Sequence, residues 1–201
     1  MTVIRQSFNQ SGVPGLDEDT EYQDCVFDGL DLKHASLRDC RFTRCSFKTA
    51  NLIGVKLNGS TFSSCDLSNV KLDGGNLFSA AFKECKFLGV SFSPQVVLTA
   101  TAFTLCIFDY GTFRGLDLSG RNFDKCSFIE ADFAMADLRK TSFVGANLTR
   151  ANFSKALFAQ TDLRGANVAG INLREDDLRG TIMTLAQIEA LAWELGIQVV
   201  E

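Results

Sequence analysis

Large apolar side chains recur at every fifth position over most of this chain, and small or polar residues fill the positions between them. A first series of Phe and Leu residues comprises Phe27, Leu32, Leu37, Phe42, Phe47, Leu52, Leu57, Phe62, Leu67, Leu72, Leu77, Phe82, Phe87 and Phe92. A second series, shifted by one residue, comprises Leu98, Phe103, Phe108, Phe113, Leu118, Phe123, Phe128, Phe133, Leu138, Phe143, Leu148, Phe153, Phe158 and Leu163. A period of five fits neither the period of about 3.6 residues in a helix nor the period of about two in a strand. The pattern instead predicts a coil with short flat sides, each of which turns one large residue inward.

The cysteines indicate the length of one turn of this coil. All seven stand two residues before a member of the apolar series, and six of them form a series of their own: Cys25, Cys45, Cys65, Cys85, Cys106 and Cys126. Successive members are 20 residues apart, except for a spacing of 21 between Cys85 and Cys106. Four five-residue sides therefore complete one turn, and the thiols stack in one inward column. The longer spacing falls where the apolar series slips, near Pro94, so one inserted residue explains both shifts.

The chain resembles the pentapeptide-repeat family. The resemblance is carried by stretches such as Asn-Leu-Ile-Gly-Val at 51–55 and the two consecutive repeats at 146–155, and it covers about residues 20–182. It implies an all-β solenoid, namely a right-handed quadrilateral β-helix, and the number of five-residue sides predicts about eight coils. A rod of eight coils would be roughly 38 Å long, at about 4.8 Å per coil.

The two ends of the chain depart from the repeat. Residues 1–19 are predicted to form an N-terminal cap, residues 20–182 the β-helix, and residues 183–201 a C-terminal helix and tail. Both open ends of a solenoid need caps because each coil is covered only by its neighbours. Thr184 followed three residues later by Gln187 is a capping-box signature for the start of the helix. Gly196, three residues before a short Val-Val tail, is suited to end it.

The predicted C-terminal helix carries more large apolar side chains than the end of one coil can cover. These residues are Leu185, Ile188, Leu191, Trp193 and Leu195. Surplus apolar surface at a solenoid end indicates association with a second copy. We therefore expect these residues to form the interface of a homodimer joined through its C-termini.

Composition argues against catalysis. The chain has one histidine, His34, so a Ser-His-Asp site or a multi-histidine metal site is hard to build. Stacked cysteines that point the same way cannot converge tetrahedrally on zinc, and they suit small apolar filler. We expect no enzyme activity and no cofactor. The apolar runs are too short to cross a bilayer and the first residues lack a signal-peptide core, so we also expect no membrane association and a cytoplasmic location.

Charge is unevenly distributed along the chain, whose net charge is −4. Residues 1–31 hold seven acids and one base, and residues 32–100 hold four acids and nine bases. Residues 101–171 hold seven acids and eight bases, and residues 172–201 hold six acids and two bases. This balance argues against direct nucleic-acid binding, because such binders usually present a basic surface.

Three acids, Asp117, Asp137 and Asp177, recur at the spacing of one or more coils in a single column. Arg139 and Arg179 flank two of them and are expected to neutralise part of the charge. The column is consistent with an ordinary solvated outer face. It is also consistent with a stiff rod whose carboxylates stand in for phosphates, which a DNA-binding groove would accept.

An apolar group surrounds the slip at Pro94. In the 20-residue phase, Leu105, Ile107 and Tyr110 lie on the outside of the cysteine-bearing side and its corners, near Leu88 and Ile129. Neighbouring exposed apolar side chains indicate a contact surface for a partner. Packing of these side chains over an internal kink is the alternative.

The C-terminal helix and its Leu-Gly-Ile ending also resemble one branch of the family, the topoisomerase-protecting proteins of the Qnr, mycobacterial and albicidin-resistance types. That resemblance implies a dimeric DNA mimic that binds DNA gyrase or topoisomerase IV and protects it from a poison such as a quinolone or albicidin. The alternative is a protein-protein interaction scaffold with an unrelated partner.

Overall fold

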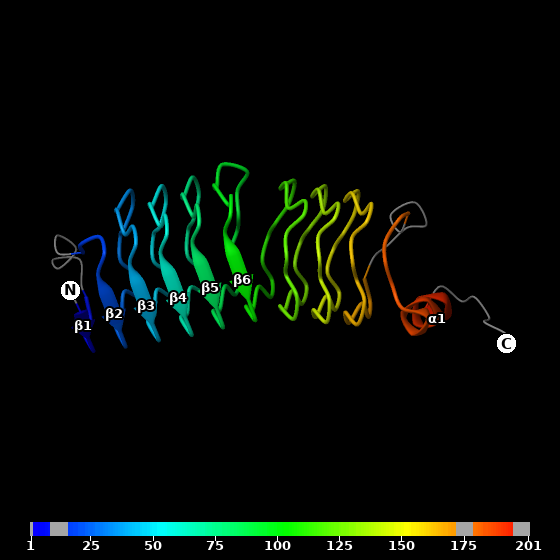
Figure 1. The fold of residues 1–201 in the computed structure, drawn as a ribbon, viewed down its shortest axis with the longest axis horizontal. Helices are drawn as coiled ribbons and strands as arrows, with labels where there is room; N and C mark the ends of the chain where they lie inside the picture. The colour runs from blue at the N-terminus through cyan, green and yellow to red at the C-terminus, as the bar shows by residue number, and fades with distance from the viewer. Residues whose placement is uncertain (1, 9–15, 172–178, 195–201) are drawn as a thin grey trace.

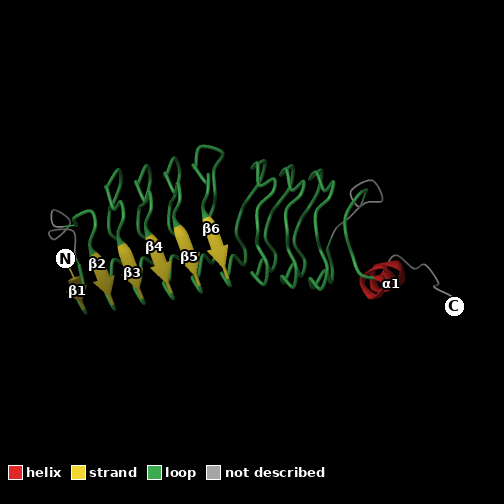
Figure 2. Cartoon of the chain, in the orientation of Figure 1, coloured by secondary structure: helices red, strands yellow, loops and turns green. Residues whose placement is uncertain are grey.

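The computed structural model describes residues 2–8, 16–171 and 179–194. It is a parallel solenoid with one short helix at its C-terminal end (Figure 1). The helix, α1, spans Leu185–Glu194. The strands, each of three residues, are β1 (Thr2–Ile4), β2 (Glu21–Gln23), β3 (Arg41–Thr43), β4 (Thr61–Ser63), β5 (Ala81–Lys83) and β6 (Ala102–Thr104). They form one sheet in the order β1-β2-β3-β4-β5-β6, so each turn of the chain returns to the same side (Figure 2).

Four columns of parallel pairing run along the rod and define its four sides. The sheet face contains β1–β6 and continues through Ser142, which bridges Asn122 and Asp162. The other three columns include the bridges Val26↔Ser46, Asp31↔Asn51 and Ser36↔Lys56. We call the first of these the cysteine face, because a cysteine precedes most of its members, and the last the aspartate face, because it includes Asp117↔Asp137. The four columns confirm the predicted quadrilateral section.

The regular strands mark the five steps from β1 to β6, so they delimit fewer turns than the eight coils predicted from the sequence. The difference has a structural reason. After Thr104 each side of a coil pairs through a single residue, such as Ser127 or Ser142, instead of a three-residue strand. The repeat counts pentapeptides, whereas a strand also requires several paired residues in a row.

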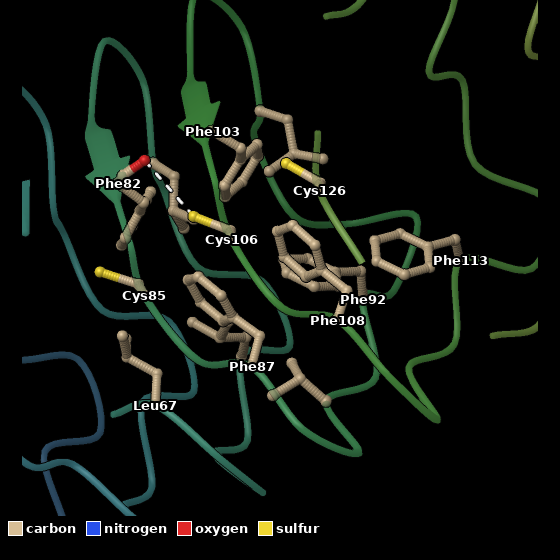
Figure 3. Close-up of a cluster of buried hydrophobic side chains, with 14 of the residues drawn as sticks. Leu67, Phe82, Cys85, Phe87, Phe92, Phe103, Cys106, Phe108, Phe113 and Cys126 are labelled. Atoms are coloured by element: carbon tan, nitrogen blue, oxygen red, sulfur yellow. Dashed lines mark hydrogen bonds between the residues drawn. The ribbon is translucent and has the colours of Figure 1, made fainter. Parts of the chain in front are cut away.

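The core is the stack of inward residues that the period predicted. Every member of both apolar series from Phe27 to Leu163 is buried, and so are all seven cysteines, which are free thiols. Rings of successive coils stack nearly parallel, as do those of Phe87 and Phe108 at 5.0 Å (Figure 3). The thiols bond to the backbone of the preceding coil: Cys106 donates to the carbonyl of Phe82 across 3.4 Å.

The one-residue slip is confirmed by the register of the sheet. Phe62 pairs with Phe82, 20 residues later, whereas Phe82 pairs with Phe103, 21 residues later. The extra residue is therefore absorbed between β5 and β6, in the segment that contains Pro94. The inward positions on either side of it stay in line.

Most sides end at a corner where the backbone takes a positive φ. Gly74 occupies one such corner, with a φ of 65°. Thr49 occupies an equivalent corner with a φ of 58°, although a β-branched residue is strained in this region. The solenoid thus imposes the corner conformation even where the sequence lacks glycine.

The N-terminal residues lie on the first coil. β1 pairs with β2 in parallel register, and Phe8 stacks on Phe27 with ring centroids 4.7 Å apart. Residues 2–8 therefore cover apolar surface that the first repeat would otherwise leave open.

At the other end, the predicted capping box is confirmed. The Gln187 N–H donates to Thr184 Oγ1 across 3.3 Å, and the Thr184 N–H donates to Gln187 Oε1 across 2.9 Å. Gln187 Nε2 also donates to the carbonyls of Leu163 and Ala166 at 2.6 and 2.8 Å. One side chain thus caps α1 and fastens it to the last coil. The predicted helix end at Gly196 lies outside the described residues.

Candidate partner-binding surfaces

The aspartate face brings together two of the three acids singled out from the sequence. Asp117 and Asp137 are bridge partners, one coil apart. Asp117 is exposed, and hydrogen bonding from Ser119 lowers the pKa of its carboxyl group. Arg139 donates to both oxygens of Asp137, at 2.9 Å from Nε and 2.5 Å from Nη2, and these bonds lower the pKa of Asp137. Asp117 therefore presents the freer negative charge of the pair.

The acidic column is short within the described residues. Val97 occupies the equivalent position before Asp117, and Leu157 the position after Asp137. Both of these apolar side chains are exposed. Asp177 lies outside the described residues. The expectation that Arg139 neutralises one member of the column is confirmed by its ion pair with Asp137.

The predicted apolar patch, Leu105, Ile107 and Tyr110, lies on one coil and crosses the cysteine face. Ile107 is half-buried in the middle of the face, where it bridges Lys86 and Ser127. Leu105 and Tyr110 occupy the two flanking corners, with exposed fractions of 43% and 60%. Exposed corner side chains do not pack over an internal kink, so the patch is open to solvent.

The C-terminal end presents a second apolar surface. Leu185, Ile188 and Trp193 are exposed on α1, and the exposed fraction of Trp193 is 63%. Leu191 instead packs against the core. Between α1 and the last coil lies a cavity of about 240 Å³, lined by residues that include Val168 and Leu191. Leu195 lies outside the described residues.

The sequence analysis did not single out Arg121, although comparing the residues that stand 20 positions apart would have found it. It occupies the small inward position that precedes the apolar residue of each side. The equivalent positions of neighbouring coils hold Thr101, Thr141 and Thr161. Arg121 is half-buried, and its Nε is buried without a hydrogen-bond partner. Burial lowers the pKa of its guanidinium.

The described residues offer little for metal or thiol chemistry. They contain no group of three or more His, Cys, Asp or Glu side chains that could hold a metal ion. Burial raises the pKa of Cys126 to about 12, which keeps this thiol protonated and unreactive at neutral pH. Within the same residues, no helix has the length and apolar character needed to span a membrane.

Two family models match this chain. The model described as a pentapeptide repeat region matches residues 18–92, and the model described as pentapeptide repeats in eight copies matches residues 106–143 and 141–180. No curated protein resembles the chain closely enough in sequence to count as a match.

A solved structure shows the same fold. QnrB1, a plasmid-mediated fluoroquinolone resistance protein, superposes with a TM-score of 0.59 at 19% identity, over 98% of this chain and 97% of that one. HetL, a pentapeptide repeat protein involved in heterocyst differentiation regulation in the cyanobacterium Nostoc sp. strain PCC 7120, gives a TM-score of 0.42 at 21% identity, over 91% of this chain and 87% of that one.

Proposed function

This chain belongs to the pentapeptide-repeat family, and on that premise we propose that it is a non-enzymatic DNA mimic that binds a type II topoisomerase. Its partner would be DNA gyrase or topoisomerase IV, which it would protect from a poison such as a quinolone or albicidin. The inside of the coil is filled by stacked rings, so any partner has to be recognised by the outer faces.

The observation that carries this proposal is the register of Asp117 and Asp137 on the outside of the rod. Coils repeat about every 4.8 Å, and phosphates recur about every 3.4 Å along one DNA strand. A column of carboxylates is therefore a sparse version of a phosphate strand. A basic groove built for a duplex would attract it, most strongly at Asp117, where the charge is least neutralised.

Dimerisation would extend the charged rod. The exposed Leu185, Ile188 and Trp193 leave the C-terminal end apolar, and this end is where a second copy would join. Two rods joined in this way would span roughly 75 Å at the same coil spacing. The name of QnrB1 as a fluoroquinolone resistance protein favours that drug class, while its 19% identity to this chain establishes the fold alone.

A gyrase supercoiling assay tests the proposal. The protein is titrated in the presence and absence of a fluoroquinolone, and we expect restored supercoiling with the drug or inhibition without it. Asp117→Lys should weaken the effect, and Asp31→Lys, an exposed acid on another side of the rod, is the matched control. Added salt should also weaken the effect, because ions screen exposed charges beyond a Debye length of about 8 Å at physiological ionic strength. A protein that neither inhibits supercoiling nor restores it in the presence of the drug would contradict the proposal of topoisomerase binding.

The apolar patch favours a second candidate function, an interaction scaffold with an unrelated partner. Tyr110 is 60% exposed, which is unusual for a large aromatic side chain unless a partner covers it. In that case binding would be insensitive to salt. It would also be lost in Tyr110→Ser and kept in Asp117→Lys.

A further inference from the structure

The pairing between two successive coils is interrupted over two neighbouring sides of the rod. Among the described residues, no backbone hydrogen bond joins residues 96–105 to residues 117–125, although these segments occupy successive coils. One coil earlier, the Leu77 N–H donates to the carbonyl of Val97 at 2.9 Å. One coil later, the Phe123 N–H donates to the carbonyl of Ser142 at 2.8 Å. The coil is therefore open on the aspartate face and the sheet face.

The other two sides stay closed at the same level. On the cysteine face the Phe87 N–H donates to the carbonyl of Ile107 at 2.7 Å, and on the fourth side the Phe92 N–H donates to that of Thr112 at 2.9 Å. The opening is thus a wedge hinged on two sides. Figures 1 and 2 show the wider separation between β6 and the coil that follows it.

Ring spacing in the core records the same wedge. Phe87 and Phe108, on the closed cysteine face, have centroids 5.0 Å apart. Phe103 and Phe123, on the open sheet face, are 5.9 Å apart. In the same column the closed pairs Phe82–Phe103 and Phe123–Phe143 are 5.3 and 5.6 Å apart, so the pair at the opening is the most widely spaced of the three.

Arg121 lies where a wedge of this kind would form. Its column holds threonine in the coil before and the coil after, and a guanidinium side chain is far larger than either. Its guanidinium makes no hydrogen bond or ion pair with the described residues, and Asp117 is the nearby acid that attracts its charge. The bulk of Arg121 explains the separation, and its charge is left without a direct partner.

The wedge opens into a cleft of about 530 Å³. Its lining includes Thr101, Phe103 and Leu105 from the coil of β6, and Asn122, Asp124 and Lys125 from the next coil. Asp124 is already engaged, because its Oδ1 accepts hydrogen bonds from the Ser142 hydroxyl and the Val144 N–H. Lys125 forms no ion pair within the described residues, and the hydrogen bonds to Asp124 come from neutral groups, so the lining of the cleft carries one negative and one positive charge.

We propose that this cleft is a docking site for an extended, acidic segment of a partner protein. The segment would pair its backbone with the edges of β6 and of residues 122–124, and place a carboxylate beside Arg121. An extended backbone is the ligand that offers both donors and acceptors at the repeat of a strand edge. The unpaired edges select this backbone, and the guanidinium of Arg121, whose Nε has no hydrogen-bond partner, selects the acid.

Insertion of a strand requires the wedge to widen. A strand between two others needs them about 9.6 Å apart, twice the ordinary spacing of about 4.8 Å. No ladder hydrogen bond has to break on the two open sides, so widening costs less here than between any other pair of coils with intact ladders. A side of five residues matches a segment of about the same length.

The test uses the full chain and a capped pentapeptide, Glu-Thr-Leu-Thr-Gly. This peptide copies one side of a coil, with Glu in the column of Arg121. In ¹H–¹⁵N spectra, millimolar peptide should shift the amides of Leu98, Phe103 and residues 117–125. The matched peptide Gln-Thr-Leu-Thr-Gly should bind about tenfold more weakly, the equivalent of about 1.4 kcal/mol, because it lacks the charge.

Two variants separate the wedge from the charge. Arg121→Thr restores the residue of the column, so the cleft should close, the Leu98 and Phe103 amides should become protected from hydrogen exchange, and the peptide shifts should vanish. Arg121→Met keeps the bulk without the charge, so binding should persist and the preference for Glu over Gln should disappear. The proposal is overturned by unchanged shifts in Arg121→Thr, or by no shifts in the unaltered protein. Shifts confined to β1 or α1, the open ends of the rod, would overturn it equally. It does not depend on topoisomerase binding.

Discussion

Phe128 offers the sharpest test of the inward columns. Its side chain has no exposed surface, and its ring stacks on Phe108 at 5.0 Å. It also meets Phe123, Phe133 and Phe143 edge to face, with centroids 5.3, 5.2 and 5.6 Å away. Phe128→Ala would therefore remove a ring that neighbours on its own coil and on both adjacent coils contact.

The cost of this substitution follows from how little the site can relax. Phe to Ala in a protein core costs about 3–5 kcal/mol, and the value rises with the volume of the cavity left behind. Here the backbone on both sides is fixed by ladder bonds, such as the Phe128 N–H to the carbonyl of Asn147 at 2.7 Å. Neighbouring coils cannot collapse around the hole, so we expect a loss in the upper half of that range.

Equilibrium unfolding in urea, followed by circular dichroism, measures the change in the free energy of unfolding. Phe78→Ala is the matched control, because Phe78 is 46% exposed and its truncation should change stability by no more than about 0.5 kcal/mol. A loss under about 1 kcal/mol in Phe128→Ala, or equal losses in the two variants, would refute the inward assignment.

Three further predictions concern the corners, the end helix and the surface charges. Thr49→Gly should raise the free energy of unfolding by up to about 1 kcal/mol in urea titrations, because glycine relieves the positive φ; a loss would show that the corner is unstrained. Ile188→Asp combined with Trp193→Asp should sediment as a folded monomer, and a dimer would place the interface elsewhere. Arg139 lowers the pKa of Asp137, so this ion pair stabilises the fold above the ordinary carboxyl pKa of 3.8 and loses its effect as pH falls below it. The stability difference between the unaltered protein and Arg139→Ala should accordingly shrink from pH 6 to pH 3, and a constant difference would contradict the pair's role.

The architecture was predictable because the period of a solenoid sequence corresponds directly to the length of its sides and of its turns. The spacing of cysteines gave the length of a turn, and the single spacing of 21 located the inserted residue that the Phe82↔Phe103 register confirms. The capping box of Thr184 and Gln187 was likewise local enough to read from four residues. Periodicity could not give the second function of Gln187, whose amide reaches the carbonyls of Leu163 and Ala166, because that contact depends on how α1 folds back.

The surfaces were less predictable than the core. The sequence analysis assigned Leu191 to the dimer interface together with its apolar neighbours on the helix, yet Leu191 packs on the core while Leu185 and Ile188 are exposed. Helical spacing defines which residues share a face, but the direction of that face depends on the tilt of α1. For the acids, the spacing predicted the column of Asp117 and Asp137 but not the close ion pair of Asp137 with Arg139, which depends on side-chain geometry.

The opening beside β6 could not be predicted from the five-residue period. The five-residue period predicts that Arg121 faces inward, but it does not predict whether the space between the coils is large enough for an arginine side chain. In a solenoid, stability is close to a sum of interfaces between neighbours, so an interface with ladders on only two of its four sides is weaker than those around it. The two coils stay joined at this site because the stacked rings of the core and the hydrogen bonds of the cysteine face are continuous across it. The same additivity that makes the fold tolerant of a weak interface lets a recognition site sit in the middle of the rod without unfolding either end.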